Sequence, residues 1–334
     1  MKRAGHLYHL IQDYENLRRA FIKASKGKQD RLEVIAYKRN LEVNLQILKN
    51  QLLRHNLDIG HYSFFYVRDP KLRLICVASF PERVLHHAVM NICEPVLERY
   101  AVYDCYACRK GKGTVKALKR AQYYCSQFKW YLKLDIRKYF DSIDQNIMLQ
   151  LLKTRFKDKE LLNLFKNILA TYHTNSGKGV PIGNLISQHL ANFYLACFDH
   201  WIKEERHITG YIRYMDDFII FGTEKLILKQ ELEYVKVFLD SQLKLQLKDN
   251  IQLNKCVKGV PFLGFRVFVD KILLKAASKK RFTKKFRKYE GNFLEGRWKL
   301  KTLIRHIEPL IAFTKLGQAN SFRRKVIERF GVLS

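Results

Sequence analysis

The sequence predicts an α+β fold with short strands between longer helices. Near the N-terminus, apolar residues recur at helical spacing, as at Leu41, Leu45, Leu48 and Leu52. Short apolar runs typical of strands lie further along, and they do not alternate regularly with helices as in a parallel sheet. The chain has 334 residues, 47% of them hydrophobic, which is enough to bury a sizeable core.

Charge is the unusual feature of the composition. The chain has 62 Lys and Arg against 31 Asp and Glu, a net charge of +31. Such self-repulsion is relieved when a polyanion neutralises it, so nucleic acid is the leading partner and an anionic membrane the second. No segment approaches the length of uncharged apolar sequence that spans a bilayer, and residues 1–21 lack a signal-peptide core. We therefore expect a cytoplasmic protein without membrane contact.

The first eighty residues predict helices followed by a hairpin. Residues 7–55 indicate two basic helices separated by a polar break at 25–30. Residues 61–70 and 72–80 read as paired strands, with Asp69-Pro70 marking the turn.

The middle of the chain predicts a helix, a strand and a second helix. The first helix covers residues 82–100. The apolar run at 130–134 indicates a strand that stops at Asp135. A glycine-containing stretch at 177–179 then precedes a helix from about 184 to 203.

The last part predicts two hairpins and a basic helical tail. Residues 210–222 read as two short strands around a two-residue tip, Met215-Asp216. Residues 260–268 read as half of another hairpin. Residues 275–334 carry 17 Lys and Arg but 4 Asp and Glu. We expect their cations to follow phosphates and most of their aromatic residues to be core: Phe282, Phe286, Tyr289, Phe293 and Trp298.

Seven cysteines are scattered without regular spacing, which does not suggest a disulfide framework. Cys105 and Cys108 form a CxxC pair. A zinc site would need two further ligands, for which His86 and His87 are candidates. We expect reduced thiols in the core, with the zinc site as the open alternative.

Three aspartates stand where a sheet can bring side chains together. Asp135 ends an apolar strand, and Asp216 and Asp217 lie at a hairpin tip between apolar strands. Carboxylates in such places are costly unless a cation meets them. Three of them would bind two divalent ions through oxygen, and ions ~3.5–4 Å apart can activate a hydroxyl and stabilise a leaving pyrophosphate. The alternative for Asp216-Asp217 is a plain polar turn.

The residues around these aspartates resemble reverse transcriptases. RYMDDFIIF contains the YMDD signature of that family between apolar strands. Other blocks follow in the family's order, including fingers blocks of group II intron-like bacterial enzymes. The resemblance covers residues 62–268 and rests on these blocks: RDPKLRLICVASFPERVLHHAVMNICEPVLE, YACRKGKGT, LKLDIRKYFDSID, VPIGNLISQHLANFYL and VPFLGFRV.

The resemblance implies a right-hand polymerase fold whose palm is an antiparallel sheet with the YMDD hairpin. The implied parts are a basic helical segment at 1–55, fingers at 56–130 and 146–178, a palm at 131–145 and 179–270, and a helical thumb at 271–334.

The resemblance also assigns the metal ligands. Asp135 and Asp216 would be the main ligands of two Mg²⁺ ions, with Asp217 beside them and the backbone carbonyl of Ile136 as a further ligand. Phe140 falls at the steric gate that selects deoxynucleotides; its alternative is a core phenylalanine.

Basic residues at matching positions would bind the triphosphate of the incoming deoxynucleotide. Lys71 and Arg73 lie where fingers residues grip it, and Arg109 is a further candidate. For Lys71 and Arg73 an ordinary solvated strand face is the alternative. A lysine acting as general acid is expected between the YMDD and FLG blocks, and both Lys248 and Lys255 remain possible.

One block favours a subclass, and the resemblance implies that it lies along the template and the incoming nucleotide, with Ile182, Gly183 and Gln188 as nucleotide-binding residues. Most group II-like enzymes have QGxxxSP, whereas this chain has IGxxxSQ, with Ile182, Gly183 and Gln188. This resembles the reverse transcriptases of diversity-generating retroelements, which copy a template-repeat RNA with errors at adenines. The implied partners are the template RNA, the cDNA/RNA duplex and a small basic accessory variability protein. Alternatively, Ile182 is only a packing variant.

Other readings stay open. One is a faithful group II-like or defence-associated reverse transcriptase, and another is an RNA-binding scaffold that has lost polymerase activity. We expect no maturase or endonuclease domain after the thumb, and no VTG motif typical of retron enzymes occurs there.

Overall fold

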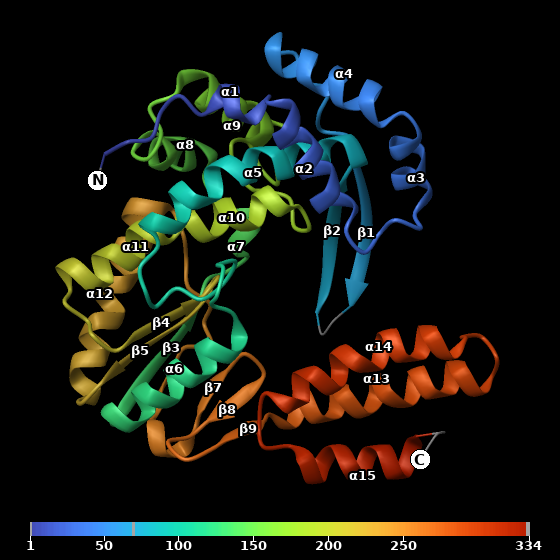
Figure 1. The fold of residues 1–334 in the computed structure, drawn as a ribbon. Helices are drawn as coiled ribbons and strands as arrows, with labels where there is room; N and C mark the ends of the chain where they lie inside the picture. The colour runs from blue at the N-terminus through green and yellow to red at the C-terminus, as the bar shows by residue number, and fades with distance from the viewer. Residues whose placement is uncertain (1, 69–70, 332–334) are drawn as a thin grey trace. The chain divides into compact units, whose positions relative to one another are not determined.

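The computed structural model describes residues 2–68 and 71–331, so the predicted turn at Asp69-Pro70 lies outside the described residues. The chain forms two compact units (Figure 1). Unit 1 comprises Met1–Arg109, Asp135–His207 and Tyr234–Asp249, and unit 2 comprises Lys110–Leu134, Ile208–Glu233 and Asn250–Ser334.

Unit 1 begins with four helices where the sequence predicted two. They are α1 (Tyr8–Ile11), α2 (Tyr14–Ser25), α3 (Leu32–Arg39) and α4 (Leu41–Leu53). Asp13 starts α2 by accepting a hydrogen bond from the backbone N–H of Asn16, and the non-helical backbone of Asn40 (φ −118°, ψ 44°) separates α3 from α4. The predicted break at 25–30 is found between α2 and α3.

A two-stranded hairpin leads from these helices into a long helix. Strands β1 (Tyr62–Arg68) and β2 (Leu72–Ala78) pair antiparallel, and α5 (Phe80–Tyr100) follows, capped by the side chain of Ser79. Asn16 joins α2 to α5 by donating from Nδ2 to the carbonyl oxygen of Ala88 over 3.1 Å.

The rest of unit 1 is helical. Its elements are α7 (Tyr139–Ser142), α8 (Gln145–Lys153), α9 (Lys159–Ala170), α10 (Leu185–Tyr194), α11 (Ala196–His200) and a π-helical turn (Trp201–Glu205). The helix predicted over 184–203 is therefore interrupted. The reason is Leu195, whose ψ of −1° departs from the helical value.

Unit 2 contains a four-stranded sheet in the order β4-β5-β3-β6. Its strands are β3 (Trp130–Asp135, whose last residue lies in unit 1), β4 (Tyr211–Tyr214), β5 (Asp217–Gly222) and β6 (Gln252–Lys255). Helix α6 (Thr114–Gln127) packs on this sheet, with the rings of Tyr124 and Phe221 centred 5.3 Å apart. Helix α12 (Lys225–Leu243) begins in unit 2 and ends in unit 1.

A second sheet and three helices complete unit 2. Strands β7 (Val260–Phe262), β8 (Phe265–Val267) and β9 (Ile272–Leu274) form a meander after a 3₁₀ turn at Cys256–Lys258. Residues 260–268 are thus a whole hairpin, not half of one, because positive φ angles at Leu263 and Gly264 close a two-residue turn.

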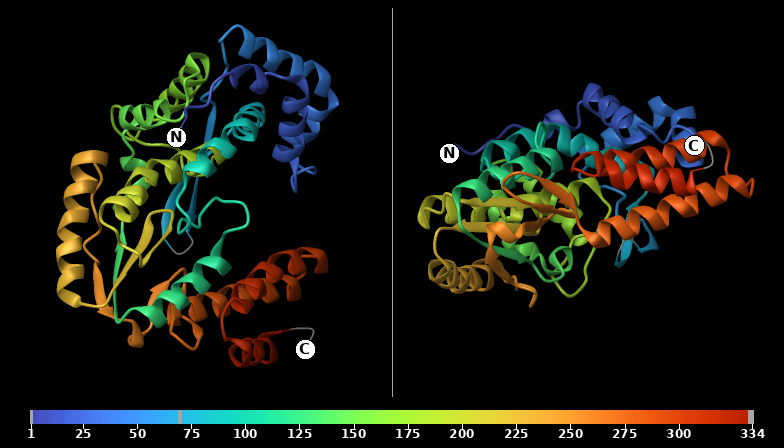
Figure 2. Two further views of the ribbon diagram at one scale, coloured as in Figure 1. Left: turned by 60° about the vertical axis from the view of Figure 1, so that its left-hand side comes forward. Right: turned by 90° about the horizontal axis from the view of Figure 1, so that it is seen from below.

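The predicted basic helical tail is confirmed as α13 (Ala276–Leu294), α14 (Leu300–Lys315) and α15 (Asn320–Phe330), which lie side by side (Figure 2). Phe282 and Phe286 form their core with Val326, as predicted for these two rings. None of the helices in the described part of the chain has both the length and the apolar character needed to cross a bilayer.

Candidate active site

The YMDD residues form the predicted hairpin. Tyr214 pairs with Asp217, so Met215 and Asp216 are its two-residue tip. Met215 has a left-handed backbone (φ +57°), and the fully buried Arg213 donates from Nη1 to the Met215 carbonyl oxygen over 3.0 Å. A buried guanidinium therefore holds the turn that presents both aspartates, which are partly exposed.

Asp217 faces a lysine that sequence reasoning missed. The ammonium of Lys133 contacts Oδ1 of Asp217 and lies 5.6 Å from the centre of the Phe262 ring. Lys133 precedes Asp135 by two residues on β3, and the neighbour of β3 in the sheet is β5, which begins at Asp217. The two-residue spacing between Lys133 and Asp135 was the sequence signal that could have identified this lysine, because strand residues two apart point to the same face.

Asp135 is held in unit 1 by a short segment of chain. The backbone N–H of Lys248 donates to the Asp135 carbonyl oxygen over 2.8 Å, and the Lys248 ammonium contacts Oδ1 of the same residue. Ile136 is fully buried and pairs with Leu247 across an antiparallel bridge.

The two candidate general acids lie in different places. Lys248 contacts Asp135, whereas Lys255 pairs with Trp130, the first residue of β3, and its ammonium lies 5.5 Å from the centre of that indole. At ~3.3 Å per strand residue, the five residues from Trp130 to Asp135 separate Lys255 from the aspartate. The structure brings only Lys248 of the two to the Asp135 carboxylate.

Phe140 lies on the short helix α7 and is partly exposed. Its carbonyl oxygen accepts from the backbone N–H of Val180 over 3.0 Å, while Tyr139, beside it, is buried and donates its hydroxyl to the carbonyl oxygen of Ala191. The two rings meet edge to face at 5.8 Å. Tyr139, not Phe140, is therefore the core aromatic of this pair.

The IGxxxSQ block is joined to the β1–β2 hairpin. The backbone N–H of Cys76 donates to the Ile182 carbonyl oxygen over 2.8 Å, and that of Ala78 donates to Oδ1 of Asn184 over 3.2 Å. Gly183 has φ +120°, and a Cβ there would lie 2.6 Å from the Cys76 carbonyl oxygen. Only glycine fits this close approach without strain.

Other predicted nucleotide-binding residues are exposed. Gln188 lies on α10, while Lys71 precedes β2 and Arg73 lies within it. Arg109 differs, because Nη1 donates to the carbonyl oxygens of Val102 and Cys105 over 2.6 and 3.0 Å. Within the described chain, these two hydrogen bonds fix the loop that contains Val102 and Cys105.

The CxxC cysteines carry free thiols. Cys105 is buried and donates to Oδ1 of Asn192 over 3.3 Å, while Cys108 is partly exposed. Over residues 2–68 and 71–331, no three His, Cys, Asp or Glu side chains gather as a set of metal ligands. The predicted magnesium ligands are divided between the units, with Asp135 in one and Asp216 and Asp217 in the other. Their oxygen donors are of the kind that Mg²⁺ prefers.

Comparison with protein families decides the class of this chain. Residues 68–267 match the family described as reverse transcriptase (RNA-dependent DNA polymerase). The chain belongs to the reverse transcriptase family. Enzymes of this family use divalent metal ions and deoxynucleotides, and the matched span contains all three candidate aspartates.

Relatives of this reverse transcriptase include bacterial and intron-encoded proteins. Protein YkfC of Escherichia coli is 24% identical over 282 residues, covering 68% of this chain and 72% of YkfC. The group II intron-encoded protein LtrA of Lactococcus lactis is 26% identical over 211 residues, covering 58% of this chain and 35% of LtrA.

A solved structure shares the mixed helix-and-sheet fold. The apo telomerase of Candida tropicalis, truncated from its C-terminal domain, has a TM-score of 0.51 and 11% identity, with 64% of this chain and 55% of that chain covered. The reverse transcriptase thus spans about half of that chain and a third of LtrA.

A further lysine that the sequence analysis did not single out, Lys275, lies between β9 and α13. The backbone N–H of Lys275 donates to the Gly264 carbonyl oxygen over 3.1 Å, so the start of α13 is tied to the β7–β8 turn. Burial, with Lys133 and Arg266 nearby, lowers the pKa of Lys275, and Asp217 partly offsets this. Lys133 thus contacts the Asp217 carboxylate directly, and Lys275 lies close enough to Asp217 for their charges to interact.

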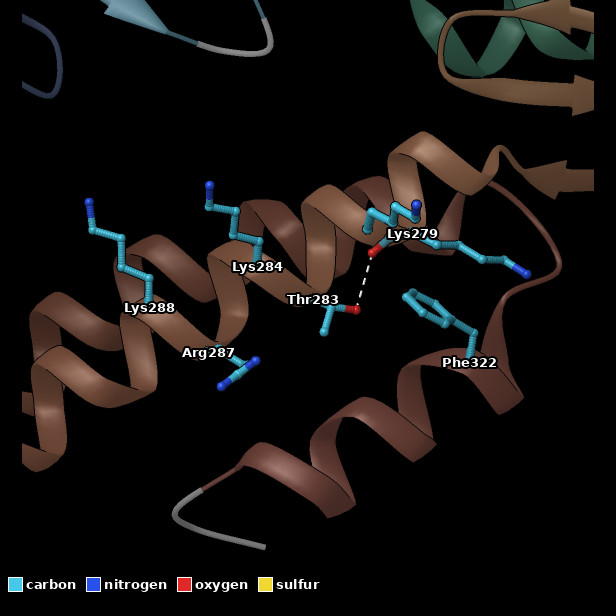
Figure 3. A pocket seen from close by; sticks show the side chains of 7 residues that line it. Lys279, Thr283, Lys284, Arg287, Lys288 and Phe322 are labelled. Atoms are coloured by element: carbon cyan, nitrogen blue, oxygen red, sulfur yellow. Dashed lines mark hydrogen bonds between the residues drawn. The ribbon is translucent and has the colours of Figure 1, made fainter.

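A basic groove of about 710 Å³ lies between α13 and α15. Its lining comprises six residues of α13, five of them basic, and Phe322 of α15, and Figure 3 shows Thr283 and Arg287 on the side of α13 that faces Phe322. A cationic groove with an aromatic ring is suited to a nucleic-acid backbone. The phosphate-tracking face of the tail stays a prediction, and the cations of this groove are its candidates.

Proposed function

We propose that this reverse transcriptase makes error-prone, adenine-mutagenic cDNA from a template-repeat RNA in a diversity-generating retroelement, by two-metal-ion nucleotidyl transfer. The observation that carries the polymerase chemistry is the sheet order. Asp135 ends β3, and Asp216 and Asp217 stand at the tip and start of β5, the neighbouring strand.

Asp135, Asp216 and Asp217, with the Ile136 carbonyl, would hold two Mg²⁺ ions. The bound ions would activate the primer hydroxyl and stabilise the leaving pyrophosphate. Lys248 supports this assignment as the general acid, because its ammonium already lies at the Asp135 carboxylate.

The proposed nucleotide pocket is built around the IGxxxSQ block, which is hydrogen-bonded to strand β2. Gly183 and Ile182 are fixed to β2 through Cys76, and Arg73 lies on β2 and Lys71 just before it. Lys71 and Arg73 would hold triphosphate oxygens, and Phe140 would exclude a 2′-hydroxyl. The exposed Gln188 completes the proposed pocket.

The polymerase parts are proposed along the same lines. We assign the palm to 131–145 and 179–270, the fingers to 56–130 and 146–178, and the thumb to 271–334, with a basic helical segment at 1–55. The thumb assignment is supported by the cationic groove of α13 and α15. The template RNA, the cDNA/RNA duplex and a small basic accessory protein are the proposed partners.

Mutagenic copying rests on Ile182. A glutamine there could hydrogen-bond near the nascent base pair, whereas isoleucine cannot, and such a contact contributes about 0.5–1.5 kcal/mol to selection. The test replaces Ile182 by Gln and, as an apolar control, by Leu, and then sequences the cDNA. Ile182→Gln should lower misincorporation at template adenines while Ile182→Leu keeps it. An unchanged error frequency in Ile182→Gln would remove this basis for the subclass.

One observation favours a second candidate. The 211-residue similarity to LtrA, named as a group II intron-encoded protein, favours a group II-like reverse transcriptase, for which we propose faithful copying. Accurate products from the unmodified chain would select this candidate over the mutagenic one.

A further inference from the structure

A groove of about 630 Å³ lies between helices α2 and α3 of unit 1. Each helix contributes four lining residues at positions i, i+1, i+4 and i+5, which begin at Phe21 on α2 and at Val34 on α3. Because residues i and i+4 share a helix face, two one-turn patches border the same space. The groove is therefore formed by the pairing of the two helices and has room for several side chains.

The groove has a firm apolar base and apolar edges. Phe21 and Val34 are 7% and 1% exposed, and the Phe21 ring stacks on the ring of Tyr37 with centres 5.9 Å apart. Ile22 and Ile35 also line the groove, but they are 59% and 36% exposed. Exposed branched side chains beside a buried apolar base favour contact with another apolar surface.

The rim of the groove is positively charged. Glu33, an acidic residue of α3, contacts Arg83 of α5 and does not line the groove. Residues 21–40 contain six basic residues against two acidic ones. The charged residues of the described lining are all basic: Lys26, Lys38 and Arg39. An occupant of the groove must therefore combine apolar groups with negative charge.

These features favour a protein helix over other occupants. RNA bases stack on aromatic rings, whereas the exposed apolar residues of this groove are isoleucines. A bilayer is flat and would contact the rim without filling the space below it. A second copy would bring a further net charge of +31 to a basic rim. An amphipathic helix places its apolar face in such a groove, and acidic residues beside that face would meet the cations.

We propose that the α2–α3 groove binds an acidic amphipathic helix of a partner protein. Aliphatic side chains of that helix lie between Ile22 and Ile35, and its carboxylates meet Lys26, Lys38 and Arg39. The docking site is independent of the proposed function, because no residue of the groove belongs to the candidate active site. The rim would repel the basic accessory protein, so the acidic partner is a different one.

Fluorescence anisotropy with two designed peptides tests the groove at about 0.15 M salt. The first labelled peptide is a helix with leucines along one face and glutamates on the other. The second has the same composition, with the leucines spread around the helix. The first should bind at least about tenfold more tightly, because only a continuous apolar face fits the groove.

Variants of the chain locate the binding. Ile22→Gln and Ile35→Gln should each weaken binding of the first peptide by about tenfold, as expected for apolar contacts at the centre of an interface. Lys38→Glu should weaken it about three- to tenfold by reversing a rim charge. The matched controls lie on α12: Ile227→Gln, at an isoleucine that is 45% exposed, and Lys229→Glu, at an exposed lysine, should leave the affinity unchanged.

Thermal unfolding of each variant separates lost docking from lost folding, and the two-peptide comparison on the unmodified chain decides the proposal even where a variant unfolds. Equal affinity for the two peptides would show attraction by charge alone and overturn the proposal. An equal loss in the α12 variants would also overturn it. Weaker binding of a labelled CA-repeat RNA by both Ile22→Gln and Ile35→Gln would give the groove to RNA instead.

Discussion

The ammonium of Lys133 contacts the carboxylate of Asp217 at the start of strand β5. Both side chains are mostly buried, with 13% and 23% of their surfaces exposed. The contact places a protein cation at one of the proposed magnesium ligands. Lys133 should therefore compete with Mg²⁺ for Asp217.

Replacing Lys133 by Met should tighten Mg²⁺ binding. A hydrogen bond to a charged group contributes about 1.5–3 kcal/mol, so the dissociation constant for Mg²⁺ should fall about ten- to a hundredfold. Isothermal titration calorimetry without nucleotides gives this constant directly. Lys255→Met, at the other end of β3, should leave it unchanged. Weaker Mg²⁺ binding in Lys133→Met would mean that Lys133 supports the metal site instead of competing with it.

Lys248 should be needed for the chemical step. Lys248→Ala should slow single-turnover nucleotide addition by about 10²-fold or more, the range for a lost general acid. Lys255→Ala should change the rate little, because Lys255 lies beside Trp130. Rapid-quench measurements give both rates. An unchanged rate in Lys248→Ala would contradict this role.

Two glycines should respond oppositely to alanine. Gly183→Ala places a methyl group 2.6 Å from the Cys76 carbonyl oxygen on a backbone of φ +120°, and should lower the free energy of unfolding by about 1–3 kcal/mol. Gly291 lies inside α13 with open space around it, so Gly291→Ala should raise that free energy by about 0.5–1 kcal/mol. Urea unfolding measures both. Equal changes in the free energy of unfolding would show that the backbone of Gly183 does not lie this close to the Cys76 carbonyl oxygen.

Acid should destabilise the fold through a buried histidine. Burial, with His87 nearby, lowers the pKa of His86 to about 3. Between the ordinary value near 6.5 and this one, the unfolded chain binds a proton that the folded chain does not, so stability is lost as pH falls. The pKa of His87 is lowered to about 4, mainly by burial, and acts in the same direction, whereas burial raises the pKa of Glu82, which opposes it.

The contribution of His86 is about 2 kcal/mol of unfolding free energy lost from pH 7 to pH 5. Urea unfolding at the two pH values should show this loss, and His86→Phe should reduce it by that amount. A pH dependence that His86→Phe leaves unaltered would place the responsible group elsewhere.

The sequence indicated the local elements well where one pattern dominated. Short apolar runs on both sides of Asp216 predicted the hairpin and its tip, and the last sixty residues were predicted to be helical, as α13 to α15 are. Predictions were wrong where one backbone conformation ended a helix, as at Asn40 and Leu195. Hydrophobic periodicity does not report such breaks.

Contacts between distant segments were less accessible from the sequence. Spacing left Lys248 and Lys255 equivalent, and the strand register, which depends on tertiary pairing, distinguishes them. Lys133 was overlooked because its spacing puts it on the same strand face as Asp135 but does not show which residue of a neighbouring strand lies opposite. The hydrogen bond from the buried Arg213 to the Met215 carbonyl oxygen likewise depends on tertiary packing.

The central claim is tested most directly by supplying the purified chain with a primed RNA template, Mg²⁺ and the four deoxynucleotides, and sequencing the products. Asp216→Asn is the control. DNA made by the unmodified chain and not by the control, with errors concentrated opposite template adenines, is the predicted result. No DNA from the unmodified chain, even with an accessory protein and cognate RNA added, would contradict the account and indicate an RNA-binding scaffold.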